Sequence, residues 1–252
     1  MVKKLLILIP SYNVEKFIKK VLYSIPKKLL KTNKVKILII NDCSTDNTVK
    51  IVKNIKKFYF KKKIITNKIN CGYGGVQKIG YNYAIKNNFD IVAMLHGDGQ
   101  YKPNLLFKLV DPINKNLSEV VFGSRMLKPL NALKGNMPIY KFIGNTIITK
   151  IQNLFLKSKL SEFHSGYRVY LVKSLKKIPF NRNSNFFHFD TEIIIQLLFA
   201  KIKIKEIPIP TIYSGQKSHL KGIKYSYNVI KITFLAMLHM FGIIKINKFE
   251  IK

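Results

Sequence analysis

The chain has 252 residues, of which 47% are apolar, so it is long and apolar enough to bury a substantial core, and wholesale disorder is excluded. Its formal net charge is +33. A surface this positive attracts anionic lipid, nucleotide or nucleic acid. The basic residues are spread along the whole chain, however, and no DNA- or RNA-binding motif is present, so we expect no specific nucleic-acid partner.

Two further observations bear on the cellular compartment. Cys43 and Cys71 do not have the spacing of a metal site, and we interpret them as reduced thiols in a cytoplasmic protein. The apolar run Leu5–Ile9 follows two lysines, as in a signal peptide, but it is too short and lacks a small-residue cleavage pattern. We therefore interpret Leu5–Ile9 as the first strand of the fold.

Strands and helices are expected to alternate along the chain. Buried strands are predicted at Leu5–Ile9, Val35–Ile40, Ile64–Thr66, Ile91–Leu95, Val120–Phe122 and Ile204–Ile207. Helices are predicted at Phe17–Ile25 with Asn13 as cap, Val49–Ile55, Gly75–Ala84, Pro103–Ile113, Pro138–Lys157, Thr191–Ala200 and Ile223–Ile244, with a loop at Glu162–Arg168. This order predicts an α/β fold with a mostly parallel central sheet flanked by helices.

The strand Ile91–Leu95 is followed directly by His96-Gly97-Asp98-Gly99-Gln100. In an open α/β sheet, ligands bind at the carboxyl ends of the strands. Asp98 and Gln100 offer the hard oxygen atoms that Mg²⁺ or Mn²⁺ prefers, and the two glycines permit a tight turn near a ligand. An ordinary strand-to-helix turn built from Asp and Gly is the alternative.

Two other predicted strands end in polar loops, at Pro10–Glu15 and Asn41–Asp46. In a doubly wound sheet these loops lie side by side, so Asp42 and Asp98 are expected to face one bound nucleotide, with the Gly72–Gly75 turn close to it. The chain contains no G-x-G-x-x-G after the first strand and no P-loop motif. Both NAD enzymes and P-loop NTPases are therefore disfavoured.

Six motifs in order resemble those of family 2 glycosyltransferases, and the closest branch is that of the polyprenol-phosphate (dolichol-phosphate mannose synthase-like) enzymes. The motifs are Ile9-Pro10-Ser11-Tyr12-Asn13-Val14-Glu15, Ile40-Asn41-Asp42-Cys43-Ser44-Thr45-Asp46-Asn47-Thr48, Asn70-Cys71-Gly72 to Gly80, Gly97-Asp98-Gly99-Gln100, Gly123-Ser124-Arg125 and Ser165-Gly166-Tyr167-Arg168. The resemblance covers residues from about 4 to 215.

The resemblance implies a GT-A fold and an inverting hexosyltransferase that uses a UDP- or GDP-linked sugar with Mg²⁺ or Mn²⁺. It also implies a set of site residues. Those expected to bind the nucleotide sugar are Pro10, Tyr12, Glu15, Asp42, Gly72 and His96; those expected at the metal and diphosphate are Asp98 and Gln100; and those expected at an acceptor phosphate are Arg125 and Arg168.

Two positions depart from the family pattern. His96-Gly97-Asp98 replaces the usual Asp-x-Asp, and Glu162 stands where an Asp is common. Histidine is a poor ligand for Mg²⁺ but can bind Mn²⁺. His96 therefore leaves the identity of the metal open, with a ribose contact or simple packing as the alternatives.

The acceptor is expected to be a polyprenyl phosphate or, alternatively, a saccharide hydroxyl in the assembly of a cell-surface polysaccharide or glycolipid. A phosphate is already anionic, whereas a hydroxyl must lose a proton to a general base. Asp190 and Glu192 are the candidate bases for that step. Together with Asp98 at the metal, they are the three residues expected to be catalytic. Their alternative role is that of negative charges at a helix N-terminus.

We divide the chain into a glycosyltransferase domain at residues 1–215 and an amphipathic helical tail at residues 216–252. Only thirteen residues separate Lys231 from Lys245, fewer than the ~20 that span a bilayer. The predicted helix is therefore expected to lie in the interface of an anionic membrane, at the inner face of the cell membrane, or to pack on the domain or on a second subunit of a homodimer.

Overall fold

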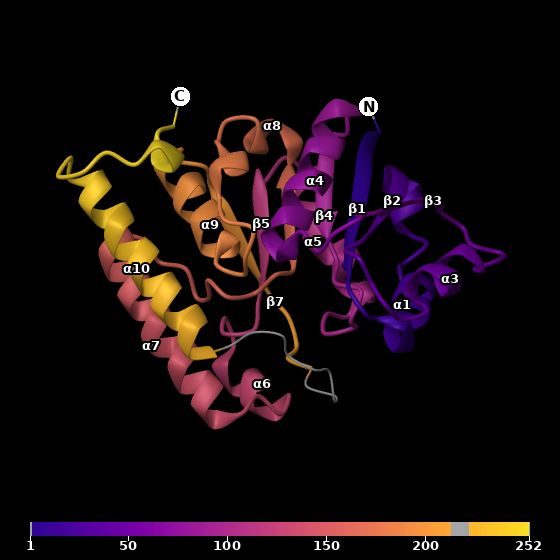
Figure 1. Cartoon of the computed structure of the whole chain (residues 1–252), viewed down its shortest axis with the longest axis horizontal. Helices are drawn as coiled ribbons and strands as arrows, with labels where there is room; N and C mark the ends of the chain where they lie inside the picture. Colours follow the sequence, from indigo (N-terminus) through magenta and orange to yellow (C-terminus); the bar gives the residue numbers. More distant parts are fainter. Residues whose placement is uncertain (1, 213–221, 252) are drawn as a thin grey trace.

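The computed structural model describes residues 2–212 and 222–251 (Figure 1). Within them, seven strands form one sheet in the order β3-β2-β1-β4-β6-β5-β7. The strands are β1 Lys3–Ser11, β2 Asn33–Asn41, β3 Lys61–Thr66, β4 Ile91–Met94, β5 Val120–Ser124, β6 Arg168–Leu171 and β7 Ile204–Pro208. Only β6 runs antiparallel to its neighbours, so the mostly parallel sheet is confirmed.

The strand β6 was not predicted from the sequence, where the segment up to Arg168 was expected to be a loop. It has only four residues and begins with a charged side chain, so it lacks the apolar run that identifies the other strands. Its backbone pairs with β4 on one side and β5 on the other. Long-range pairing, rather than local sequence pattern, therefore makes this segment a strand.

Helices cover both faces of the sheet. They are α1 Glu15–Tyr23, α2 Leu29–Thr32, α3 Thr48–Lys53, α4 Gly72–Lys86, α5 Leu106–Asn114, α6 Pro129–Lys134, α7 Ile139–Leu156, α8 Val172–Leu175, α9 Phe189–Phe199 and α10 Gly222–Met240. Three short 3-10 helices are η1 Pro103–Leu105, η2 Phe180–Arg182 and η3 Asn247–Phe249. In β1, Leu5, Ile7 and Ile9 pack with α1 and α5, whereas Leu6 and Leu8 point to the face that α4 and α9 cover. This alternation explains why the central strands are apolar throughout.

The expected helix cap at Asn13 was wrong. The helix α1 begins at Glu15 without a side-chain cap, and Asn13 has a positive φ of 51°. Its Oδ1 instead accepts a hydrogen bond from the backbone N–H of Thr45, at 2.9 Å. Asparagine tolerates this left-handed conformation better than most residues, so Asn13 joins two loops rather than ending a helix.

The helices α7 and α10 lie side by side at one end of the molecule, with α6 beside one end of α7 (Figure 1). α10 buries Val229, Ile232 and Ala236, and Phe249 beyond it is 1% exposed and packs against Phe199. The C-terminal segment therefore shares the core of the sheet. The predicted domain boundary after residue 215 lies outside the described residues.

Among the described residues, none of the helices combines the length and the apolar character that crossing a membrane requires.

Candidate functional site

Two of the three strand-end loops are joined by reciprocal hydrogen bonds. The Glu15 carboxylate accepts from the backbone N–H and the side-chain amide of Asn47, at 2.9 and 3.1 Å. In return, the Asp46 carboxylate accepts from the Glu15 N–H at 3.0 Å. Tyr12, in the loop after β1, is 39% exposed. The loops after β1 and β2 thus form one braced surface at the carboxyl ends of adjacent strands.

Asp42 connects the end of β2 to the start of α4. Its buried carboxylate accepts hydrogen bonds from the backbone N–H groups of Cys71 and Gly72, at 2.8 and 3.0 Å, and from the Asn67 side chain at 2.7 Å. Gly72 has a φ of +76°, and a Cβ there would lie 2.6 Å from the carbonyl oxygen of Asn185. Only glycine fits this turn. Asp42 therefore holds the glycine-rich turn at the carboxyl end of β2.

The loop after β4 brings Asp98 to the same edge. The Gly97 N–H donates to the carbonyl oxygen of Pro10 at 3.3 Å, and a Cβ on Gly97 would lie 2.9 Å from Ser11 Oγ. The Asp98 carboxylate accepts from the Gln100 N–H at 3.0 Å, and the residue is half-buried. The first and third predicted loops therefore touch, as expected from the strand order.

The donor set at Asp98 fits a cation that is shared with a nucleotide. No group of three or more His, Cys, Asp or Glu side chains that could hold a metal occurs among the residues that the structure describes. Mg²⁺ and related ions at nucleotide sites use one or two carboxylates and complete their shell with phosphate oxygens and water. A half-buried Asp98 at the sheet edge meets that requirement.

His96 occupies a tight aromatic pocket next to Asp98. Its ring stands edge-on to Tyr73 and Tyr101, with centroids 5.5 and 4.9 Å away. A Cβ on Gly166 would lie 2.6 Å from His96 Nε2, so the glycine of the Ser-Gly-Tyr-Arg motif makes room for this ring. Burial lowers the pKa of His96, against the opposing effects of Asp98 and Asp190.

Asp190 lies at the centre of a buried polar network. Its carboxylate accepts from the Tyr73 hydroxyl at 2.9 Å and from the Gln77 side-chain amide at 3.1 Å, and it pairs with Arg168 at 3.3 Å. Tyr73 and Gln77 both come from α4, and the sequence did not identify either one. Tyr73 lies within the motif Asn70-Cys71-Gly72 to Gly80, and this motif is the sequence feature that could have identified it.

Arg168 is completely buried. Its guanidinium donates to the carbonyl oxygens of Ser165, Asp190 and Phe163, at 2.8, 3.0 and 2.9 Å. The acceptor-phosphate role expected for Arg168 does not fit this position, because the donors are directed at backbone carbonyls inside the core. The structure instead gives Arg168 the task of holding Asp190 and the loop before β6.

Glu192 is separated from the site although it lies two residues after Asp190. Its carboxylate accepts from the Ser184 N–H at 2.6 Å and pairs with Lys248 at 2.7 Å. These partners belong to the loop before α9 and to η3. Glu192 is one of the two candidate bases expected from the sequence, and its partners place its carboxylate against the C-terminal segment.

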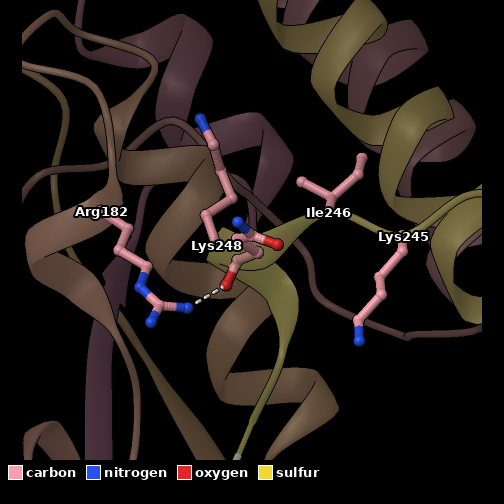
Figure 2. Close-up of a pocket in the computed structure, with 5 residues that line it drawn as sticks. Arg182, Lys245, Ile246 and Lys248 are labelled. Atoms are coloured by element: carbon pink, nitrogen blue, oxygen red, sulfur yellow. Dashed lines mark hydrogen bonds between the residues drawn. The ribbon is translucent and has the colours of Figure 1, made fainter.

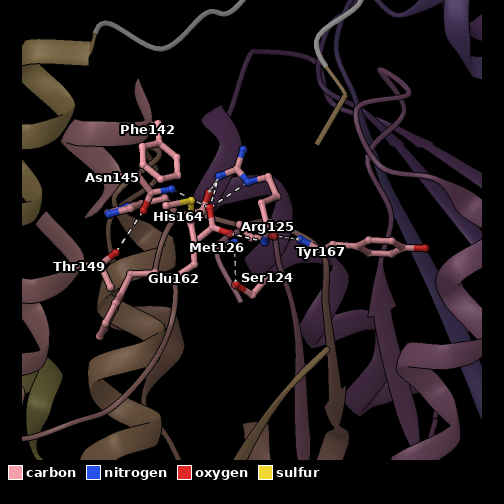
Figure 3. Close-up of polar contacts among 12 residues, drawn as sticks. Ser124, Arg125, Met126, Phe142, Asn145, Thr149, Glu162, His164 and Tyr167 are labelled. Carbon is pink, nitrogen blue, oxygen red and sulfur yellow. Dashed lines mark hydrogen bonds and ion pairs between the residues drawn. The ribbon is translucent and has the colours of Figure 1, made fainter. Parts of the chain in front are cut away.

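Arg125 and Glu162 form an ion pair at the end of β5 (Figure 3). The Glu162 carboxylate accepts from the Arg125 backbone N–H at 2.7 Å, from Arg125 Nε at 2.9 Å and from the Asn145 side chain on α7 at 2.9 Å. Burial by itself raises the pKa of Glu162, but these partners together hold it below its usual value. The Arg125 side chain is 15% exposed, so its fork is fixed at the rim rather than in the core.

Figure 2 shows a depression at the C-terminal segment, remote from the strand-end loops in the sequence and lined by Arg182 and residues 245–248. The Arg182 guanidinium donates to the carbonyl oxygen of Asn247 at 2.6 Å. We interpret this contact as one that fixes the tail, since Lys245 and Lys248 are paired with Glu250 and Glu192.

An open α/β sheet whose strand ends carry acidic and glycine-rich loops is typical of nucleotide-binding enzymes. The model of the family "Glycosyl transferase family 2" matches residues 6–179, and the chain belongs to this family. The fold is therefore GT-A, and the protein is a glycosyltransferase.

Similar proteins are known from several organisms. The chain is 30% identical over 224 residues to a UDP-N-acetylglucosamine–dolichyl-phosphate N-acetylglucosaminyltransferase of Methanococcus voltae, covering 84% of this chain and 87% of that one. It is 27% identical to a dolichyl-phosphate beta-glucosyltransferase of Saccharomyces cerevisiae, over 84% and 67% of the two chains. The glucosyl-3-phosphoglycerate synthase of Mycobacterium tuberculosis, solved with UDP, shares the fold with a TM-score of 0.66 at 15% identity, over 96% and 82% of the chains.

Proposed function

We propose that this protein is an inverting hexosyltransferase that moves a sugar from a nucleotide-diphosphate sugar to a polyprenyl phosphate. One observation carries the choice of acceptor. The two carboxylates that could deprotonate a hydroxyl are both engaged, Asp190 by Arg168 and Glu192 by Lys248. An acceptor that is already an anion needs no base. The relatives named for dolichyl phosphate support the same choice.

The donor is proposed to bind across the braced loops at the carboxyl ends of β1, β2 and β4. Pro10, Tyr12, Glu15 and Asp42 would hold the nucleoside, with Gly72 letting the backbone pass close to it. Asp98, assisted by Gln100, would hold Mg²⁺ or Mn²⁺ at the diphosphate. The solved complexes of the Mycobacterium tuberculosis enzyme with Mn²⁺ and UDP-glucose support a divalent cation.

The mechanism follows from the charges around the site. When bound, the cation supplies Lewis-acid stabilisation of the departing diphosphate. Arg125 presents its guanidinium fork at the rim, where a charged donor can contact an acceptor phosphate. Glu162 holds that fork in place through a buried ion pair. Direct attack by the acceptor phosphate then inverts the sugar carbon without any proton transfer to the protein.

We also propose that the enzyme works as a peripheral protein on an anionic membrane, at its cytoplasmic face. The large apolar side chains exposed on or near α6, α7 and α10 support this: Leu127, Leu130, Leu133, Ile139, Tyr140, Ile143, Ile147, Leu154, Ile223, Tyr227, Ile230, Phe234, Phe241 and Ile243. Exposed lysines accompany them: Lys128, Lys150, Lys157, Lys224, Lys231 and Lys245. Each contributes about 1 kcal/mol near anionic lipid, and α6 and α7 extend the surface beyond the predicted C-terminal helix.

The decisive experiment offers UDP- and GDP-sugars with Mn²⁺ and three acceptors: a polyprenyl phosphate, the matching polyprenol and a free saccharide. We expect transfer to the phosphate alone, and Asp98→Ala should abolish it. Transfer to the saccharide but not to the phosphate would contradict the proposal. Sedimentation with vesicles tests the membrane surface separately, since binding should require anionic lipid and weaken with salt.

A further inference from the structure

The hydroxyl of Tyr73 lies between two groups of the site. It is 2.9 Å from a carboxylate oxygen of Asp190 and 3.2 Å from Nε2 of His96. A phenol has a single proton to donate. The two contacts therefore cannot both be donations from Tyr73, and the choice between them determines which nitrogen of His96 carries a proton.

The surroundings of Asp190 decide the direction. Its carboxylate is paired with the buried Arg168 and also accepts from Gln77, which identifies it as an ionised acceptor. Hydrogen bonds to an ionised acceptor are roughly twice as strong as neutral ones. Tyr73 thus donates to Asp190, and its oxygen accepts the Nε2–H of His96. In a neutral imidazole the other nitrogen, Nδ1, then carries a lone pair.

The ring is also held in one orientation. Tyr73 and Tyr101 stand against it edge-on, and the Cα of Gly166 leaves no room for a side chain beside Nε2. Among the described residues, no hydrogen bond is made by Nδ1, and this atom is not among the buried polar atoms that lack a partner. A fixed and accessible lone pair is thus offered two residues from Asp98.

We propose that His96 Nδ1 and the Asp98 carboxylate bind the same divalent cation, and that this pair makes the enzyme select Mn²⁺ over Mg²⁺. This inference rests on the proposed function. Imidazole suits borderline transition metals, whereas Mg²⁺ prefers a shell of oxygen ligands. Tyr73 and Asp190 act as positioning residues, because a partner on the second ring nitrogen fixes the tautomer of a ligating histidine.

The test is pulsed electron paramagnetic resonance of Mn²⁺ bound to the full chain, alone and with UDP. We expect a nitrogen modulation from a coordinated imidazole in the wild type. It should disappear in His96→Asp, a variant that still binds Mn²⁺ and gains affinity for Mg²⁺. Tyr73→Phe should weaken Mn²⁺ binding about 10- to 100-fold. Tyr83→Phe, on the same helix, is the matched control and should bind like the wild type.

The outcomes separate this inference from the proposed function. If Mn²⁺ binds in a manner that depends on Asp98 but shows no nitrogen modulation, His96 is not a ligand and the inference fails, while the transferase proposal stands. Equal affinity of the wild type for Mn²⁺ and Mg²⁺ would likewise overturn it. If sugar transfer is absent while the nitrogen modulation is present, the metal pair is supported and the proposed reaction fails.

Discussion

His164 connects the loop before β6 to α10, and its protonation should control acid stability. Its Nδ1 lies 2.8 Å from the Tyr225 hydroxyl, and its Nε2 is buried without a hydrogen-bond partner among the described residues. Burial lowers the pKa of His164 from 6.5 to about 4, against the opposing effect of Glu162. The folded protein therefore keeps this ring neutral at pH values where the unfolded chain has already protonated it.

The sign and size of the effect follow from this difference. Because the unfolded chain binds the proton first, the contribution is fully present above about pH 6.5 and is lost as the pH falls toward 4. A pKa that drops from 6.5 to about 4 corresponds, at about 1.4 kcal/mol for each pH unit, to about 3 kcal/mol of unfolding free energy.

The assay compares urea unfolding of the wild type and His164→Gln, which cannot titrate, between pH 8 and pH 4. We expect the difference between their unfolding free energies to be constant above pH 7 and to change by about 3 kcal/mol by pH 4, with the wild type losing more. Subtraction removes the other titrating groups. The reasoning is refuted if the unfolding free energies of the two proteins change with pH in parallel. It is also refuted if the NMR resonance of His164 titrates near the ordinary pKa of histidine.

Three further predictions concern single contacts. Glu162→Gln should cost about 3–5 kcal/mol, because it leaves the Arg125 guanidinium without its buried partner, whereas Glu250→Gln, in the exposed pair with Lys245, should leave the urea midpoint unchanged. Phe249→Ala should lower the unfolding free energy by about 3–5 kcal/mol, since the ring is 1% exposed; an unchanged midpoint would mean that the tail is not part of the core. Arg125→Lys keeps the charge but loses the fork, so it should raise the KM for a polyprenyl phosphate and leave the nucleotide affinity as it was, as steady-state kinetics and UDP titration would show.

The sequence was sufficient for the parts of the fold that depend on local pattern. The long apolar runs of β1 and β2 and the 3.6-residue periodicity of α1, α5 and α7 identify those elements without any knowledge of their neighbours. Because parallel strands deliver their carboxyl ends to one edge, the placement of Asp42, Gly72 and Asp98 at that edge also followed from the order of elements. Six motifs in sequence then identified the family.

The roles of Arg168 and Glu192, which are both buried, could not be obtained from local sequence pattern. Arg168 stands in one of the six motifs and Glu192 at the start of a predicted helix, but whether a side chain faces a ligand or the core depends on what packs around it. The strand β6 lies between β4 and β5 and runs antiparallel to both. Arg168, its first residue, pairs with Asp190. The tail, in turn, brings Lys248 to Glu192 across 56 residues of sequence.

The amino-acid sequence by itself thus determined the class of fold, the edge of the sheet at which the candidate loops gather, and the family, since each depends on residues that are neighbours along the chain. The tertiary structure decided the chemistry within the site. It brought Tyr73 against His96 and, from 117 residues away, against Asp190. Hydrogen bonds act over about 3 Å, so which groups share a proton is settled only when distant segments are packed together.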